Sequence, residues 1–314
     1  MNVNYNQIAW VEKYRPQSVK DCILPKQVRN LGLGIVSSGE MPNLLLCGTA
    51  GTGKTALSRS LCNDLSLDYI FINASRERGI DEVRNKITTF ASSMSFNGKR
   101  KVVILDEADQ LTHDAQLALR AAIEEFAKNC SFILTCNYVN RLFEPLHSRC
   151  VVVDFKISPD EKKDILKEMY IRSCLILDQE SIQYDKKVLL QFLSKYFPDF
   201  RRTINELQGY SKISNNVDIG ILSRGSNIDI DELFRYIQIK SFNKIREWCV
   251  LNSSNDVNLI YRKLYNEGLE HVKNESKCEF IEIVYRHLYQ SASVPDKELN
   301  LFACMLSILG YCEV

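Results

Sequence analysis

Two short stretches of this sequence carry the residue types that phosphate chemistry needs. Residues 48–55 read GTAGTGKT, which fits G-x-x-x-x-G-K-[ST] between an apolar run and a helical pattern. In such a loop, backbone N–H groups converge on phosphate oxygens, the lysine reaches the β and γ phosphates, and the hydroxyl ligates Mg²⁺. The stretch therefore predicts an ATP site formed by Gly48, Gly51, Thr52, Gly53, Lys54, Thr55 and Ala56.

The second stretch, VVILDE at residues 102–107, places two carboxylates at the carboxyl end of an apolar strand, where α/β sheets collect ligands. Asp106 suits the magnesium shell together with Thr55, and Glu107 suits a base that positions the attacking water. Adjacent carboxylates on a buried strand are costly without a cation, so the pair favours ATP hydrolysis with Mg²⁺. The letters DEAD are also typical of RNA helicases, but the following strand reads ILTCN, without their Ser-Ala-Thr signature.

The bulk composition limits the remaining function classes. At 314 residues, 45% apolar and 25% charged, the chain is long enough for two domains, or three if one is small. Its 40 basic and 39 acidic residues nearly cancel, so any DNA contact must come from a local patch of positive charge. Eleven cysteines without zinc spacing predict buried thiols in a reducing compartment. Without a signal-peptide pattern or a membrane-length apolar run, we expect a cytoplasmic protein with no membrane partner.

Apolar runs of strand length recur between residues 43 and 155, separated by segments of helical length. The runs are NLLLC, DYIFIN, KVVILD, SFILTCN and CVVVDF. Because their hydrophobicity is continuous rather than alternating, we expect a parallel sheet with both faces covered by helices. The first half of the chain is therefore predicted to be α/β.

The second half of the chain is predicted to be helical. Ser158 begins SPDE, which offers an N-cap serine, a proline at the first helical position and a glutamate three residues after the cap. We expect four segments: a nucleotide-binding domain at 1–157, a helical lid at 158–213, a linker at 214–229 and a C-terminal helical domain at 230–314. In the last helix the expected core face is Leu299, Phe302, Leu306 and Leu309, with an oligomer interface as the alternative.

Five ordered motifs resemble one family. They are WVEKYRP at 10–16, NASRERGIDEVRNKI at 73–87, LTHDAQLALR at 111–120, TCNY at 135–138 and SRC at 148–150. Together they are similar to the sliding-clamp-loader ATPases, an AAA+ group that includes the small subunits of replication factor C. Residues 90–102 and 196–223 look closest to the large clamp-loader subunit of T4-like bacteriophages. The resemblance implies a P-loop AAA+ domain, a helical lid and an all-α collar.

The resemblance also implies further catalytic residues beside Lys54 and Glu107. Asn137 matches the sensor-1 residue near the γ-phosphate, and Arg201 matches the sensor-2 arginine of the lid. Arg149 resembles an arginine finger that completes the ATP site of a neighbouring subunit. Outside this family, Asn137 would be an ordinary turn asparagine, and Arg149 and Arg201 would be ordinary surface arginines. The implied adenine contacts, which are also compatible with ordinary packing, are Val11, Tyr14, Pro16 and Ile23.

One segment combines a basic surface with an apolar end. Residues 76–101 hold seven basic and three acidic side chains, and an apolar helical stripe directs the charges outward. Arg78, Arg84 and Lys86 are candidate contacts to DNA phosphates, with a solvated helix face as the alternative. Met94 and Phe96 precede an Asn-Gly turn, and the resemblance implies that they dock into the clamp. Core packing is the alternative for these two residues.

Taken together, these patterns predict an ATPase subunit of a sliding-clamp loader. Several copies, with one distinct small loader subunit, would bind ATP, open a ring-shaped clamp and hold primer–template DNA. Hydrolysis stimulated by DNA and clamp would then release both. Two alternatives stay open: another AAA+ machine, such as a helicase loader or branch-migration motor, and a replisome scaffold that does not hydrolyse ATP. For a bacteriophage protein, the compartment would be the host cytoplasm.

Overall fold

A computed structural model describes residues 9–77, 79–93, 98–223, 228–252, 257–291 and 293–313. The chain divides into two compact units, at residues 1–221 and 222–314. Each unit has a hydrophobic core of its own, and each is described by itself below.

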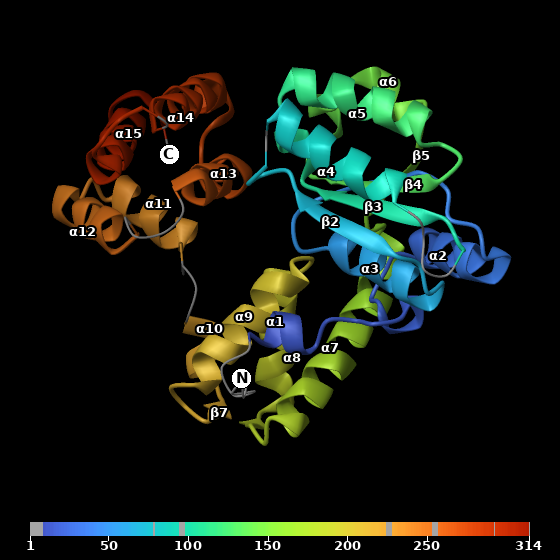
Figure 1. Cartoon of the computed structure of the whole chain (residues 1–314). Coiled ribbons are helices and arrows are strands. Elements are labelled where there is room, and N and C mark those ends of the chain that lie inside the picture. The colour runs from blue at the N-terminus through green and yellow to red at the C-terminus, as the bar shows by residue number, and fades with distance from the viewer. Residues whose placement is uncertain are drawn as a thin grey trace. The chain divides into compact units, whose positions relative to one another are not determined.

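A five-stranded parallel sheet forms the centre of the first unit (Figure 1). Its order is β2-β3-β4-β1-β5, so the first strand lies inside the sheet and receives crossovers on both sides. The strands are β1 (Leu44–Cys47), β2 (Tyr69–Asn73), β3 (Lys101–Asp106), β4 (Cys130–Cys136) and β5 (Val151–Asp154). All five strand-length runs predicted from the sequence are strands.

Helices cover both faces of this sheet, as the continuous hydrophobicity of the strands predicted. Alternate residues of one strand enter different cores: Leu45 packs towards α4 and α5, whereas Leu44 and Leu46 pack towards α2 and α3. The edge strand β5 is the exception, because Val151 and Val152 are about half exposed. The helices are α2 (Lys26–Ser38), α3 (Lys54–Asp64), α4 (Ile80–Ser92), α5 (His113–Glu125) and α6 (Glu144–His147), with short 3₁₀ turns η2 (Val19–Asp21), η3 (Ala108–Gln110) and η4 (Val139–Arg141).

A helical region completes the first unit and begins where the capping signal predicted. Ser158 and Glu161 form a capping box around the 3₁₀ turn η5 (Pro159–Glu161), with proline in the first turn. The turn leads into α7 (Lys162–Gln179), α8 (Lys186–Tyr196) and α9 (Phe200–Ser211), and the N-terminal helix α1 (Trp10–Lys13) packs against α9.

Part of the predicted linker at 214–229 is folded onto this helical region. β7 (Asn216–Val217) pairs in parallel with β6 (Gln183–Tyr184), and α10 (Gly220–Ser223) follows. Val217 is fully buried, and the Tyr210 hydroxyl donates to Asp218 Oδ1 over 2.6 Å. The Asn- and Ser-rich composition suggested a linker, because the two buried apolar residues of this short segment (216–223), Val217 and Ile221, leave almost no periodic signal.

The second unit is all α-helical. Its helices are α11 (Ile230–Gln238), α12 (Phe242–Asn252), α13 (Val257–Gly268), α14 (Lys277–Ser291) and α15 (Lys297–Tyr311), with a 3₁₀ turn η6 (Asn274–Ser276). The expected core face of α15 is only partly correct: Phe302 and Leu309 are partly buried and pack against the core, whereas Leu299 faces solvent. Leu299 is 63% exposed, and the buried apolar residues are Leu301, Cys304, Met305 and Ile308. Because α15 is apolar around most of its circumference, its periodicity does not select a single face.

Two sequence-wide expectations can be compared with the described part of the chain. No helix in it is long and apolar enough to cross a membrane. All eleven cysteines are free. Most are buried as expected, but Cys278 is exposed.

The corrected face of α15 gives a matched pair of variants. Leu301→Ala should lower the free energy of unfolding by about 2–5 kcal/mol, because it leaves a cavity in a closed core. Leu299→Ala should change it by less than about 0.5 kcal/mol. Denaturant unfolding followed by tryptophan fluorescence measures both, since Trp248 lies in the same core. Equal losses for the two variants would contradict the observed orientation of the helix.

Candidate ATP site

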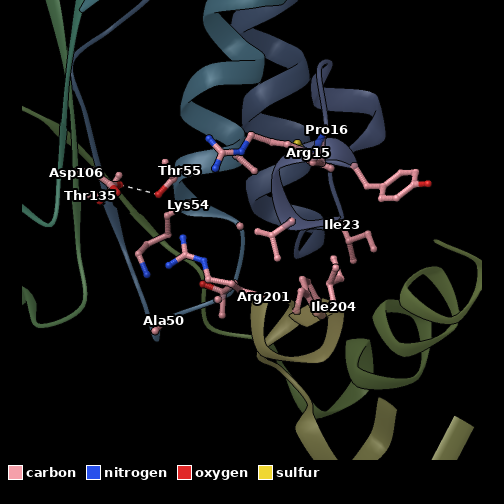
Figure 2. Close-up of a pocket in the computed structure, with 18 of the residues that line it drawn as sticks. Arg15, Pro16, Ile23, Ala50, Lys54, Thr55, Asp106, Thr135, Arg201 and Ile204 are labelled. Atoms are coloured by element: carbon pink, nitrogen blue, oxygen red, sulfur yellow. Dashed lines mark hydrogen bonds between the residues drawn. The ribbon is translucent and has the colours of Figure 1, made fainter. Parts of the chain in front are cut away.

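A pocket opens at the carboxyl ends of the parallel strands, between the sheet and the helical region (Figure 2). Its floor is the glycine-rich loop between β1 and α3. Gly48 requires a glycine because its φ is +147° and a Cβ would come within 2.9 Å of Phe155 Cβ. Of the residues predicted to bind ATP, all except Gly48 line this pocket: Val11, Tyr14, Pro16, Ile23, Gly51, Thr52, Gly53, Lys54, Thr55, Ala56 and Asp106.

Lys54 joins the glycine-rich loop to the end of β4. Its buried ammonium donates to the carbonyl oxygens of Gly48 and Thr49 at 2.7 and 2.8 Å, and to Asn137 Oδ1 at 3.0 Å. Burial lowers the pKa of Lys54. The three acceptors hold the lysine beneath the loop, at the place where the motif requires a cation for phosphates. Asn137, predicted as the sensor residue, is therefore placed beside this cation.

Oxygen donors from three segments meet beside the loop. Thr55 Oγ1 and Thr135 Oγ1 donate to the same carboxylate oxygen, Asp106 Oδ1, at 2.6 and 2.8 Å. Figure 2 shows Thr55 and Asp106 facing each other across the dashed contact. A hydroxyl and a carboxylate at this separation are hard oxygen ligands of the kind that Mg²⁺ prefers. The donor set therefore fits the predicted ion.

Glu107 adopts an unusual backbone conformation at the end of β3. Its φ is +57°, in the left-handed region that residues with a Cβ rarely adopt. Its backbone N–H donates to Thr135 Oγ1 over 3.0 Å, which fixes the turn. The residue lines the pocket one position after Asp106. Backbone strain of this kind collects at functional sites, and the role of Glu107 as a base stays a prediction.

The N-terminal segment is held in place by the helical region. The Tyr14 hydroxyl donates to Glu180 Oε1 over 2.5 Å, and Arg172 donates to the Tyr14 carbonyl oxygen over 3.0 Å. The backbone N–H of Trp10 donates to Gln208 Oε1. These contacts keep the side chains predicted to surround the adenine at the pocket wall.

The beginning of α9 lies directly on the glycine-rich loop. The backbone N–H of Phe200 donates to the Gly51 carbonyl oxygen over 3.1 Å. Asp199 caps α9 and stands so close that a Cβ on Gly51 would lie 1.9 Å from its Oδ1. This contact brings Arg201 into the pocket, where Figure 2 shows its guanidinium beside Lys54. A change at the phosphates can therefore be passed to the helical region through Gly51.

Sequence reasoning missed several pocket residues. The Nη1 atom of Arg15 is buried and has no partner among the described residues, although its Nη2 atom pairs with Glu12. Burial lowers the pKa of Arg15, so an anion in the pocket would be a favourable partner. Arg15 lies inside the WVEKYRP stretch and could have been found there. Thr135 and Cys136 lie inside the TCNY stretch, and Phe200 and Ile204 lie inside residues 196–223, so they could also have been found there. Arg172 depends on a tertiary contact and had no local signal.

The remaining predicted residues lie elsewhere. Arg149, between α6 and β5, does not line the pocket; its Nε donates to Glu124 Oε1 over 2.7 Å and its Nη1 to the Pro145 carbonyl. Arg84 and Lys86 are exposed on α4, and Lys86 pairs with Glu77. Arg78, Met94 and Phe96 lie outside the described residues.

Comparison with known proteins agrees with this arrangement. Residues 44–156 match the profile of the ATPase family associated with various cellular activities (AAA), and residues 161–223 match that of the sliding-clamp-loader large subunit, AAA+ ATPase lid domain. The chain is 34% identical to the sliding-clamp-loader large subunit of Enterobacteria phage T4 over its whole length and 99% of that protein. The chain belongs to the sliding-clamp-loader family of AAA+ ATPases.

Other relatives of this clamp-loader ATPase support the assignment. It is 38% identical to the sliding-clamp-loader large subunit of Escherichia phage RB69, over 78% of the chain and 79% of that protein. It is 41% identical to the replication factor C small subunit of Archaeoglobus fulgidus, over 67% of the chain and 66% of that protein. The Holliday junction branch migration motor RuvB of Thermotoga maritima shares the fold, with a TM-score of 0.53 and 16% identity over 74% of this chain and 84% of that one.

The close contact at Gly51 gives a test of how the clamp-loader lid meets the nucleotide site. Gly51→Ala should lower ATP affinity at least about tenfold, because the methyl group meets Asp199 and φ is +77°. Gly34→Ala on α2 is the control, since a Cβ there meets nothing within 4 Å. Titration with a fluorescent ATP analogue compares the two variants. If both bind like the wild type, the lid contact does not constrain the loop.

Proposed function

We propose that this ATPase drives the opening and release of a ring-shaped sliding clamp, and that its ATP site is completed by an arginine from a neighbouring subunit. The observation that carries the proposal is the position of Arg149. The residues predicted to bind nucleotide surround one pocket, whereas Arg149 stays outside it and is paired with Glu124. A site with this composition binds ATP within one chain, and every cation that lines it, Arg15, Lys54, Arg172 and Arg201, belongs to that same chain.

The chemistry within one subunit follows from the pocket. Lys54 and the loop N–H groups hold the β and γ phosphates, and Thr55 with Asp106 would ligate Mg²⁺, which neutralises phosphate charge when bound. Glu107 orients the attacking water and accepts its proton. Asn137 and Arg201 approach the γ-phosphate from the sheet and the lid. Turnover then needs one further positive charge.

Arg149 of a neighbouring subunit supplies that charge in this proposal. Its side chain is about one-quarter exposed, so its contacts with Glu124 and Pro145 can be exchanged for a phosphate on an adjacent chain. An arginine supplied in this way is worth about a thousandfold or more in rate. Hydrolysis would therefore depend on assembly, so that ATP is cleaved only within a ring of subunits.

The surface of α4 is the proposed contact with primer–template DNA. Val83 and Ile87 are buried, so the helix turns Arg84 and Lys86 outward as expected. Lys86 already pairs with Glu77 at 2.7 Å, which makes Arg84 the stronger candidate. Contacts of this type bind phosphates without reading sequence. The clamp contact is proposed for Met94 and Phe96 by resemblance alone.

The second unit is the proposed collar for ring assembly, at residues 230–314. Its helices leave large apolar side chains in contact with solvent. Examples are Leu251 on α12 and Tyr285 and Tyr289 on α14, which are 78%, 65% and 75% exposed. Surfaces of this composition typically bind other protein chains. The partners proposed here are further copies of this chain and one distinct small loader subunit.

A branch-migration motor is the second candidate, because RuvB shares the fold. The two functions differ in their stimulus: a clamp loader requires a ring-shaped clamp with primed DNA for full turnover, whereas a branch-migration motor requires DNA alone.

The proposed role of Arg149 as an arginine finger is tested by mixing variants. Arg149→Ala should bind ATP like the wild type but lose about a thousandfold in stimulated turnover, and Lys54→Ala should lose ATP binding. A mixture of the two proteins should regain part of the turnover, because some sites combine an intact Lys54 with an intact Arg149. A steady-state phosphate-release assay measures each case.

Glu124→Gln is the matched control for this experiment. It removes the ion pair with Arg149 but keeps the guanidinium. A finger acting in trans leaves turnover largely intact in Glu124→Gln. If Glu124→Gln loses as much activity as Arg149→Ala, or if the mixture stays inactive, Arg149 acts within its own chain.

The DNA contact is tested by salt dependence. Arg84→Ala should weaken binding of primed DNA similarly for all sequences and reduce the slope of log affinity against log salt by about one. Lys128→Ala is the control, because Lys128 is exposed beyond α5, at the amino-terminal edge of the sheet. Fluorescence anisotropy at several salt concentrations gives both slopes. A slope unchanged in Arg84→Ala removes this residue from the interface.

A further inference from the structure

Two thiols lie beneath the phosphate-binding loop and take no part in the chemistry described so far. Cys47 is the last residue of β1 and Cys136 the last of β4, and the two are Cα partners in the parallel pairing of these strands. The Cys136 thiol donates to the Cys47 sulfur over 3.5 Å. Both side chains are buried, with 7% and 1% exposed.

We propose that Cys47 and Cys136 are a reversible oxidation site, at which hydrogen peroxide converts the two thiols into a disulfide that weakens ATP binding. In the first step one thiolate attacks a peroxide oxygen, the O–O bond breaks, and a sulfenic acid and water form. The second thiol then attacks this sulfur and displaces water. Overall, two thiols and one peroxide give one disulfide and two waters.

The pocket provides the route to this pair. Cys136 is part of the nucleotide pocket wall, next to Asn137, although it is only 1% exposed. The pocket is therefore the route by which a small oxidant would approach the pair. The hydrogen bond from Cys136 lowers the pKa of Cys47, against the opposing effects of burial and of Asp154, whereas the same contact and burial raise the pKa of Cys136. Cys47 is therefore the thiol that ionises first and attacks the peroxide. In the proposed ATP complex, the nucleotide would cover Cys136 and engage Lys54. Bound nucleotide should therefore protect the pair.

The consequence for ATP follows from the residues next in the chain. Cys47 precedes Gly48 and Cys136 precedes Asn137, and both of these neighbours accept hydrogen bonds from Lys54. The backbone N–H of Gly48 also donates to the Cys136 carbonyl oxygen over 3.3 Å. A disulfide requires the sulfurs to approach to about 2.05 Å. The strand ends must shift to allow this, and the acceptors of Lys54 shift with them.

Other cysteines provide the controls. Cys62 is also buried, but it packs in the core on the opposite face of the sheet. Cys150 packs against the same core as the pair and is only partly buried. Oxidation at Cys150 would give a different linked peptide. The position of the cross-link therefore identifies the site.

The test treats the full chain with hydrogen peroxide, with and without Mg²⁺ and ATP, followed by peptide mass spectrometry without reduction. The expected result is a Cys47–Cys136 linked peptide, an ATP affinity lowered at least about tenfold, and recovery with dithiothreitol. Nucleotide should slow formation of the link. Cys47→Ser should keep its own untreated affinity after peroxide, whereas Cys62→Ser should stay sensitive.

Three outcomes would overturn the proposal. They are oxidation without a link between these residues, a link that leaves ATP affinity unchanged, and equal peroxide sensitivity in Cys47→Ser. The peptide mass measurement on the wild type tests the proposed link even if a serine variant does not fold. All readouts concern ATP binding by one chain, so their failure leaves the proposed roles of Arg149, DNA and the clamp untouched.

Discussion

The structure of the nucleotide site depends on how one buried cation is held. Lys54 is taken out of water, and its ammonium is stabilised by two loop carbonyls and by Asn137. A buried charge must be paired or hydrogen-bonded, so the loop and the end of β4 are locked to each other through this side chain. Any change at the phosphates therefore alters the loop and the sheet edge together.

A second constraint connects this locked edge to the lid. The loop carbonyl of Gly51 accepts a hydrogen bond from Phe200, and no side chain larger than hydrogen fits between Gly51 and Asp199. The same helix carries Arg201 into the pocket. We therefore expect phosphate binding and lid position to be coupled through this direct contact. Arg149 stands outside this coupled group, which is why the proposed mechanism needs a second subunit.

Much of the fold and part of the site could be predicted from sequence because their signals are local. The five apolar runs, the glycine-rich loop and the Ser158 capping box each depend on adjacent residues. Arg172 gave no such signal, because it acts through a contact with Tyr14, which is distant in the chain. Thr135 lies in the TCNY stretch, but its role depends on a contact with the distant Asp106. The core face of α15 was predicted only in part, because a helix that is apolar around most of its circumference does not select one face. The folding of residues 216–223 onto the helical region was missed, because two buried residues in so short a segment give no periodic signal. The roles of Arg84 and Arg149 stay predictions.

The central claim is that ATP is cleaved only where one chain meets another. The most direct measurement is ATP turnover per chain across a range of protein concentrations, with the assembled fraction determined in parallel by mass photometry. The account predicts that turnover per chain rises with the assembled fraction and falls to background where only monomers remain. A rate per chain that stays constant down to the monomer would contradict it.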